Sequence, residues 1–175
     1  YKVNYTGWQN AKPEAVERLV NPLNYTDKNS KDYLQFLKLS GTAGLDANEV
    51  NSKVLWNKGI LANKASSFIQ ASKEYNVNEV YLIAHALLET GNGTSALSTG
   101  VGIIVENGKP RLAKNGEKPQ DYSYNMYGIN AKDSCALECG ALYAYQMGWT
   151  TPEKAIVGGA SFIASGYVSQ GQDTI

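Results

Sequence analysis

The segment YLIAHALLETGNGTSALSTG, residues 81–100, places an ionisable group at the end of a strongly apolar run. Glu89 would stand in the last turn of a helix, where burial and the helix dipole both disfavour the ionised carboxylate. Both effects favour the protonated carboxyl, which a general acid needs. The alternative is that Glu89 simply leaves the helix into solvent. The glycines that follow, Gly91 and Gly93, favour the catalytic interpretation because they let a ligand approach the backbone closely.

The chain contains only one histidine and two cysteines. The single histidine, His85, lies one helical turn before Glu89 and either tunes that acid or is a hydrogen-bonded core residue, which we favour. Cys135 and Cys139 stand four apart in a helical pattern, where fixed Cβ directions argue against a bridge, so we interpret them as buried apolar residues. With no cluster of cysteines or histidines, we expect no metal and no cofactor.

Helices must position Glu89, and their ends are marked by capping residues. Asp46 opens a capping box, Asn78 resembles an N-cap, and Thr151 precedes a proline suited to the first helical position. We also expect Trp149 to pack between helices. Helices are predicted over residues 13–20, 32–39, 61–72, 79–90 and 134–147. Two more are predicted to begin near residues 46 and 152. The first of these would end at Gly59, and Gly158-Gly159 would separate the second from the helix that follows it.

Residues 101–120 have a different character. The stretch VGIIVENGKPRL holds β-branched residues around Asn107-Gly108, a pair typical of tight hairpin turns, and Asn115-Gly116 predicts a second turn. We therefore expect a mainly helical, α+β domain over residues 1–175, with a small β lobe at about 101–120. Residues 1–45 would form an N-terminal helical extension packed on it.

The composition excludes several functional classes. The chain has 175 residues, 43% hydrophobic and 18% charged, which is typical of one globular domain. Sixteen basic and sixteen acidic residues give a net charge of zero, which argues against nucleic acid as a partner. The apolar runs are too short for membrane insertion. We also expect the domain to be a monomer. Because the chain starts at Tyr1, with neither an initiator Met nor a leader, we expect a processed or excised piece of a longer protein.

Several motifs together resemble a known family. HALLETGNGTSALSTG, YNMYGINAKD, GWTTPEKAIVGGASFI and GYVSQGQDTI occur in the order found in the glucosaminidase domain of bacterial autolysins, glycoside-hydrolase family 73, over roughly residues 48–175. The resemblance implies a lysozyme-like, two-lobed helical fold with a β hairpin on the rim of its cleft. It also implies cleavage of the N-acetylglucosaminyl-β-1,4-N-acetylmuramyl bond of peptidoglycan, outside the cell and at the wall, in remodelling, daughter-cell separation or autolysis.

The resemblance also implies roles for individual residues. Glu89 would be the catalytic acid and Tyr127 the active-site tyrosine. The residues expected to contact the glycan are Asn92, Tyr122, Tyr124, Asn125 and Gly128.

A second carboxylate is not fixed by any motif. The candidates are Asp121, Glu117 and Glu106, of which Glu106 borders the hairpin turn and is equally interpreted as a solvated charge. Two carboxyl groups about 5 Å apart would indicate retention of configuration, and a wider separation would indicate inversion. Alternatively, the 2-acetamido group of the substrate attacks the anomeric carbon, and no second carboxylate is needed.

Other functions fit parts of the same pattern. A muramidase or a lytic transglycosylase would use the same fold and the same acid but would leave different sugar ends. A wall-binding module without catalysis is a further alternative, disfavoured by the intact LETGNGTS stretch. A peptidoglycan amidase or peptidase is disfavoured because no metal-binding or nucleophile motif accompanies the resemblance.

Overall fold

The computed structural model describes residues 10–174. Their contacts form two compact units: one contains the residues up to Lys38 together with Thr174, and the other spans residues 39–173. The smaller unit contains α1 (Pro13–Val20), as predicted, and the 3-10 helices η1 (Pro22–Tyr25) and η2 (Tyr33–Phe36). None of residues 10–38 is buried. The single domain over 1–175 stays a prediction, and residues 1–9 of its extension lie outside the described residues.

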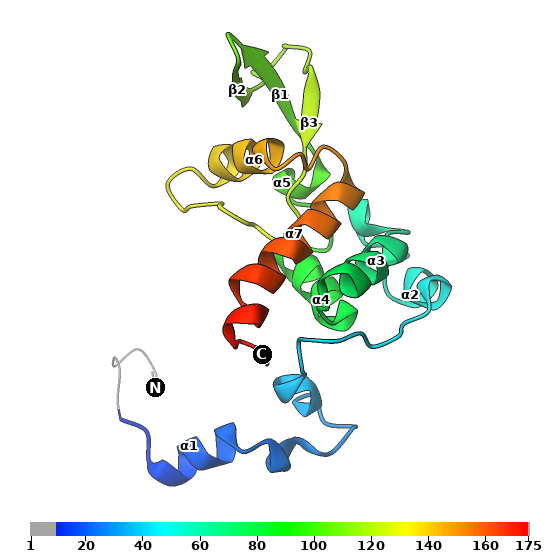
Figure 1. The fold of residues 1–175 in the computed structure, drawn as a ribbon, viewed down its shortest axis with the longest axis vertical. Coiled ribbons are helices and arrows are strands. Elements are labelled where there is room, and N and C mark those ends of the chain that lie inside the picture. Colours follow the sequence, from blue (N-terminus) through cyan, green and yellow to red (C-terminus); the bar gives the residue numbers. More distant parts are fainter. Residues whose placement is uncertain (1–9, 175) are drawn as a thin grey trace. The chain divides into compact units, whose positions relative to one another are not determined.

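Four helices of the larger unit share one core. These are α2 (Ala47–Lys53), α3 (Ala65–Tyr75), α4 (Glu79–Glu89) and α7 (Pro152–Gly166). Helix α3 packs against α2, α4 and α7 (Figure 1). The contacts bury Phe68, Leu82 and Ile156 completely, so this cluster holds α4, which carries Glu89, in place.

The predicted helix caps are confirmed. The side chain of Asp46 accepts a hydrogen bond from the amide of Glu49, and Asn78 and Thr151 cap α4 and α7 in the same way. Some boundaries differ from prediction. The helix from Asp46 ends at Lys53, before Gly59, which instead begins the 3-10 helix η3 (Gly59–Leu61). The helix predicted over residues 61–72 is α3, at Ala65–Tyr75, and the one predicted over 32–39 is the shorter η2.

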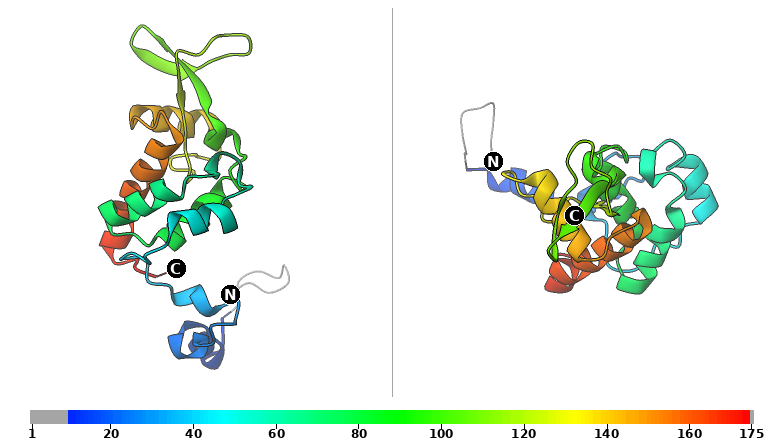
Figure 2. Two further views of the ribbon diagram at one scale, coloured as in Figure 1. Left: turned by 90° about the vertical axis from the view of Figure 1, so that its right-hand side faces the viewer. Right: turned by 90° about the horizontal axis from the view of Figure 1, so that it is seen from above.

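A small antiparallel sheet follows α4. Its strands are β1 (Val101–Glu106), β2 (Lys109–Leu112) and β3 (Asp121–Ser123), in the order β2-β1-β3. The hairpin at Asn107-Gly108 is confirmed, and both turn residues have positive φ. The sheet packs on α5 (Ala96–Thr99) and α6 (Ala136–Gln146), and Figure 2 shows the hairpin extending away from the helices. Strand β3 was not predicted, because three residues are too few for a period-2 pattern.

The fold class is therefore confirmed as mainly helical with a small sheet. One group of elements is formed by α2, α3, α4 and α7, and the other by α5, α6 and the sheet. The chain passes between the two groups twice after Glu89, in the loop that joins α4 to α5 and in the loop that joins α6 to α7. The segment between β3 and α6 supplies further residues of the site.

The predicted break at Gly158-Gly159 is wrong, because α7 continues through both glycines. Each glycine instead makes room for an aromatic ring. A Cβ atom on Gly158 would lie 2.0 Å from Nε1 of Trp149, and one on Gly159 would lie 2.2 Å from Cδ2 of Tyr127. Trp149 is 3% exposed and packs between helices as predicted. Close ring packing, rather than helix termination, explains the glycine pair.

The prediction for the two cysteines is also wrong. Cys135 and Cys139 form a disulfide, with Cα atoms 5.4 Å apart, and both residues are half-buried. The expectation assumed that both positions were helical. Cys135 is instead the N-cap residue of α6, with φ −151° and ψ 34°, so its Cβ direction is not that of a helix.

One buried carboxylate ties the start of the larger unit to α4. Glu79 is 1% exposed and accepts hydrogen bonds from the amides of Ala43, Gly44 and Leu45 and from the hydroxyl of Ser72. These donors anchor the loop before α2 to the first residue of α4. Sequence analysis did not single out Glu79.

Candidate active site

Glu89 is the last residue of α4, and its side chain is 40% exposed. The dry interior that the apolar run predicted is therefore absent around this carboxyl group. Helix α4 is less buried than its apolar sequence suggests, because Leu88 is 78% exposed and Ala84 is exposed as well. Glu89 thus lies at the surface end of a helix whose other end is buried.

The glycine-rich loop after Glu89 packs against protein backbone. Thr90 is buried, donates to the carbonyl of Ala86 and accepts from the amide of Gly93. A Cβ on Gly93 would lie 2.2 Å from the carbonyl oxygen of Lys58, and the amide of Ile60 donates to the Gly93 carbonyl. Close backbone approach does occur here, as predicted for a ligand, but its partner is the η3 region.

A second loop brings Gly128 to Glu89. Asn125 is 1% exposed; its amide group donates to the carbonyls of Ile129 and Gly140, and its oxygen accepts from the amide of Ile129. These bonds fold the NMYGI stretch around the Asn125 side chain. Gly128 has a φ of +63°, and a Cβ there would lie 3.0 Å from Oε2 of Glu89. Glycine suits this position, because the backbone has a positive φ and because a Cβ atom would crowd the Glu89 carboxyl group.

Tyr127 lies beneath this loop and is 5% exposed. Its ring packs on Gly159, and its hydroxyl donates to the carbonyl of Ile156 in α7 at 3.4 Å. Burial raises the pKa of the Tyr127 phenol, so it stays protonated at neutral pH. The described geometry therefore gives the hydroxyl a partner within the fold.

His85 lies close to both Glu89 and Tyr127. Its Nε2 atom lies 3.7 Å from Oε1 of Glu89, and its ring centroid lies 5.5 Å from that of Tyr127. The side chain is 26% exposed, but its Nδ1 atom is buried and has no hydrogen-bond partner. The favoured interpretation, a hydrogen-bonded core histidine, is therefore wrong.

Two hollows meet at Gly128. One, of about 300 Å³, has Glu89 in its wall, and the other, of about 330 Å³, has His85 and Tyr127 in its wall. The first is lined by Glu89, Ser95, Ala96, Leu97, Asn125, Gly128, Ala131 and Leu137; the second by Tyr81, His85, Tyr127, Gly128, Ile129, Asn130, Phe162, Ile163 and Tyr167. The carboxyl group of Glu89 thus borders a divided space that is rich in aromatic side chains on one side.

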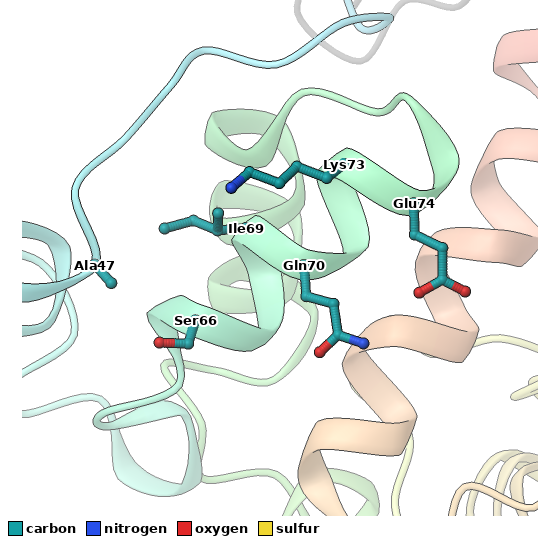
Figure 3. A pocket seen from close by; sticks show the side chains of 6 residues that line it. All are labelled: Ala47, Ser66, Ile69, Gln70, Lys73 and Glu74. Carbon is teal, nitrogen blue, oxygen red and sulfur yellow. The ribbon is translucent and has the colours of Figure 1, made fainter.

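A separate hollow of about 500 Å³ lies on the outer side of α3 (Figure 3). Its lining includes Ile69, Gln70, Lys73 and Glu74, and Figure 3 shows Lys73 and Glu74 pointing in different directions. The polar groups do not converge, so its volume alone does not make it a candidate site.

The three candidates for a second carboxylate all belong to the sheet region. Arg111 forms ion pairs with both Glu106 and Glu117; its guanidinium lowers the pKa of Glu117 to about 2 and also lowers that of Glu106. Glu106 lies five residues along β1 from Val101, about 16 Å away. Asp121 pairs with Ile103, two residues from Val101, where β1 begins at the base of the sheet. It lines neither hollow beside Glu89.

The remaining predicted contacts do not line the two hollows beside Glu89. Asn92 and Tyr122 are exposed, and neither lines the two hollows beside Glu89. Tyr124 is half-buried; its amide donates to the carbonyl of Trp149, and its ring lies against Gly100. Of the five predicted glycan contacts, the structure brings Asn125 and Gly128 to Glu89.

Within residues 10–174, no group of three or more His, Cys, Asp or Glu side chains is placed to hold a metal ion. Within the same described range, no helix is both long and apolar enough to cross a bilayer.

Comparison with known proteins relates the fold and site to one family. The glucosaminidase profile, described as mannosyl-glycoprotein endo-beta-N-acetylglucosaminidase, matches residues 65–173. The beta-N-acetylglucosaminidase of Bacillus subtilis (strain 168) is 51% identical over 177 residues, covering 99% of this chain and 18% of that protein. The chain therefore spans less than a fifth of this relative.

Solved structures of autolysins resemble this fold. The crystal structure of a major bifunctional autolysin superposes with a TM-score of 0.75 and 36% identity, covering 98% of this chain and 64% of that one. A second match is a catalytic Glu-to-Ala mutant of Staphylococcus aureus autolysin E in complex with the disaccharide NAG-NAM. Its TM-score is 0.63 at 37% identity, covering 81% of this chain and 56% of the other.

A helical domain with a glutamate at the junction of two hollows fits the glycoside hydrolases, which cleave sugar bonds with carboxyl groups. The family match is more specific. The chain belongs to the glucosaminidase family, whose members are endo-β-N-acetylglucosaminidases.

Proposed function

We propose that this domain hydrolyses the N-acetylglucosaminyl-β-1,4-N-acetylmuramyl bond of peptidoglycan, outside the cell and at the wall. The observation that carries the proposal is the position of Glu89 between two hollows in a chain of the glucosaminidase family. The relative crystallised with NAG-NAM supports the substrate class, and its catalytic mutation, a glutamate replaced by alanine, supports a glutamate as the acid.

In this proposal Glu89 protonates the leaving oxygen of the scissile bond. Its carboxyl group is accessible without substrate, and the Oε2 atom faces Gly128, where the two hollows meet. A sugar on either side of this point would cover the carboxyl group and remove water from it. Desolvation then favours the protonated acid in the complex, although the free site leaves Glu89 exposed.

We propose substrate assistance as the route to the first intermediate, because neither hollow beside Glu89 is lined by a second carboxylate. The 2-acetamido oxygen attacks the anomeric carbon while the glycosidic bond breaks and the Glu89 proton moves to the leaving oxygen. Water then opens the resulting oxazolinium ring and returns a proton to Glu89. If a carboxylate acts instead, Asp121 is our candidate, because of its position near the base of the sheet.

The other predicted residues take supporting roles. Asn125 shapes the loop that carries Gly128, and Tyr127 forms part of the wall of the second hollow. We propose that Asn92 and Tyr122, which are exposed and lie outside these linings, contact sugars further along the glycan strand.

The products of a digest test this function. Purified peptidoglycan is digested with the domain, reduced with borohydride, and analysed for terminal sugar alcohols by mass spectrometry. We expect reduced N-acetylglucosamine. Reduced N-acetylmuramic acid would indicate a muramidase, anhydro-muramyl ends a lytic transglycosylase, and new amines an amidase or peptidase. Binding to peptidoglycan without any cleavage would indicate a wall-binding module.

A second assay tests substrate assistance. A glucosamine-derived thiazoline, which mimics the oxazolinium ring, should inhibit the domain competitively, and glycans without the N-acetyl group should not be cleaved. Cleavage of such glycans would contradict substrate assistance and favour a protein nucleophile such as Asp121.

A further inference from the structure

We propose that His85 is a positioning residue for Glu89: its neutral imidazole directs the Nε2 proton at Glu89 and stabilises the carboxylate that forms as Glu89 gives up its own proton. This inference rests on the proposed function and deepens it.

The two oxygens of Glu89 have different surroundings. Oε1 lies 3.7 Å from Nε2 of His85, and Oε2 faces the Cα atom of Gly128, between the two hollows. A protonated carboxyl group has one carbonyl oxygen, which accepts, and one hydroxyl, which donates. A donor at Oε1 therefore leaves the proton on Oε2, the oxygen that borders the space for the substrate.

The separation of 3.7 Å is longer than a hydrogen bond but short enough for a small side-chain rotation to close it. Glu89 is 40% exposed, so its carboxyl group has room to turn. Catalytic hydrogen bonds are often long in a free enzyme and shorten in the complex. The one-turn spacing of the two residues on α4 keeps them on the same face of the helix.

The buried Nδ1 atom determines which form of His85 is favoured. This atom has no hydrogen-bond partner, and a buried N–H without an acceptor is costlier and rarer than an unpaired lone pair. The imidazolium and the Nδ1–H tautomer would both place a proton there. The neutral Nε2–H tautomer avoids this, and its single proton points toward Glu89.

The surroundings of His85 agree with a neutral ring. Burial lowers the pKa of His85, and the nearby Glu89 carboxylate only partly opposes this effect. The titratable groups that face it are Glu89 and Tyr81 on α4, Tyr127 on the loop, and Tyr167 after α7; no lysine or arginine lines this hollow. Burial also raises the pKa of Tyr81 and Tyr127, so both remain uncharged phenols.

The contribution to catalysis follows from the change of charge on Glu89. Before proton transfer, the Nε2 proton meets a neutral carbonyl oxygen; afterwards it meets a carboxylate. Hydrogen bonds to ionised acceptors are about twice as strong as neutral ones. The interaction is therefore stronger in the transition state than in the ground state, which raises kcat rather than lowering KM.

Two substitutions at this position form a matched pair. His85→Phe keeps a flat ring against Tyr81 and Tyr127 but removes both nitrogens. His85→Gln has a donor nitrogen at the same number of bonds from Cα as Nε2. We expect His85→Phe to lower kcat by about 10- to 100-fold with KM little changed, and His85→Gln to retain most of the activity. Equal losses in both variants, or full activity in His85→Phe, would overturn the inference.

A spectroscopic measurement keeps the inference testable if His85→Phe unfolds. The chain has one histidine, so a tag-free, nitrogen-15-labelled sample gives a single set of imidazole signals. At pH 7 we expect Nε2 protonated and Nδ1 bare, with the Nε2 signal shifted in Glu89→Gln. A ring with the proton on Nδ1, or one that does not sense the Glu89 substitution, would contradict the proposal.

The outcomes also separate this inference from the proposed function. If the wild-type domain does not cleave peptidoglycan, or Glu89→Gln keeps full activity, the proposed function fails. If Glu89→Gln is inactive while His85→Phe, with an unchanged Tm, is fully active, the proposed function stands and the role of His85 alone is refuted.

Discussion

Glu79→Gln should destabilise the domain strongly at neutral pH. The carboxylate is 1% exposed and accepts bonds from three consecutive backbone amides, at Ala43, Gly44 and Leu45, and from the hydroxyl of Ser72. An amide side chain keeps the shape but has one oxygen in place of two, so its nitrogen would face backbone donors. Buried donors would then lack an acceptor.

The magnitude follows from the pKa of Glu79. Burial alone would raise this pKa, but the amides of Ala43 and Leu45 and the hydroxyl of Ser72 outweigh it and lower the pKa to about 2. The usual value for glutamate is about 4.3, so the shift corresponds to about 3 kcal/mol of folding free energy at pH 7. Because the folded-state pKa is the lower one, this contribution is present above about pH 4.3 and is lost as the pH falls toward 2.

Urea denaturation of the wild type and Glu79→Gln at pH 7 and pH 3 measures this contribution. We expect a difference of about 3 kcal/mol at pH 7 that falls to about half at pH 3. Glu138→Gln, at an exposed position in α6, is the matched control and should change little at either pH. A difference below about 1 kcal/mol at pH 7, or one independent of pH, would refute the reasoning.

Two further predictions concern packing and the disulfide. Gly159→Ala should destabilise the domain by about 1–3 kcal/mol and lower its activity, because a Cβ there would overlap the Tyr127 ring. Gly166→Ala is the control and should leave stability unchanged, because the space around Gly166 is open. Thermal melting of both variants measures the two effects. Replacing Cys135 and Cys139 together by serine should lower the unfolding free energy in urea by about 2 kcal/mol, because the bridge closes a loop of only five residues. Unchanged stability of Gly159→Ala, or of the variant with both cysteines replaced, would contradict the corresponding prediction.

Local chemistry explains the predictions that succeeded. Asp46, Asn78 and Thr151 each act on backbone amides two or three residues away, so the signal and its effect lie within one stretch of sequence. The Asn107-Gly108 turn is local in the same way. Such features are readable from the sequence because nothing distant is needed to form them.

Contacts between distant segments explain two of the failures, and a local departure from helical geometry explains a third. The glycine pair in α7 is explained by rings from Tyr127 and Trp149, which sequence alone does not place there. Cys135 forms a bridge because its backbone departs from helical geometry. Glu79 carried one usable signal, an acid in the first turn of an apolar helix, but its backbone donors lie more than thirty residues earlier.

The site stays a proposal, and only its surroundings can be compared with the sequence. The motif match and the position of Glu89 at the end of a helix led to the proposal, but they did not indicate that its side chain is 40% exposed. The spacing of His85 and Glu89 was visible in the sequence. The buried, unpartnered Nδ1 atom became apparent only once the loop with Tyr127 was placed against α4.

The central claim, that Glu89 is the general acid, is tested most directly by comparing two leaving groups in Glu89→Gln. An oligosaccharide leaving group needs protonation, whereas dinitrophenolate leaves unaided. We predict that kcat/KM of the variant falls at least about 100-fold on glycan strands but much less on a dinitrophenyl glycoside of the same sugars, at an unchanged Tm. Equal losses on both substrates, or near-full activity on glycan strands, would contradict the assignment.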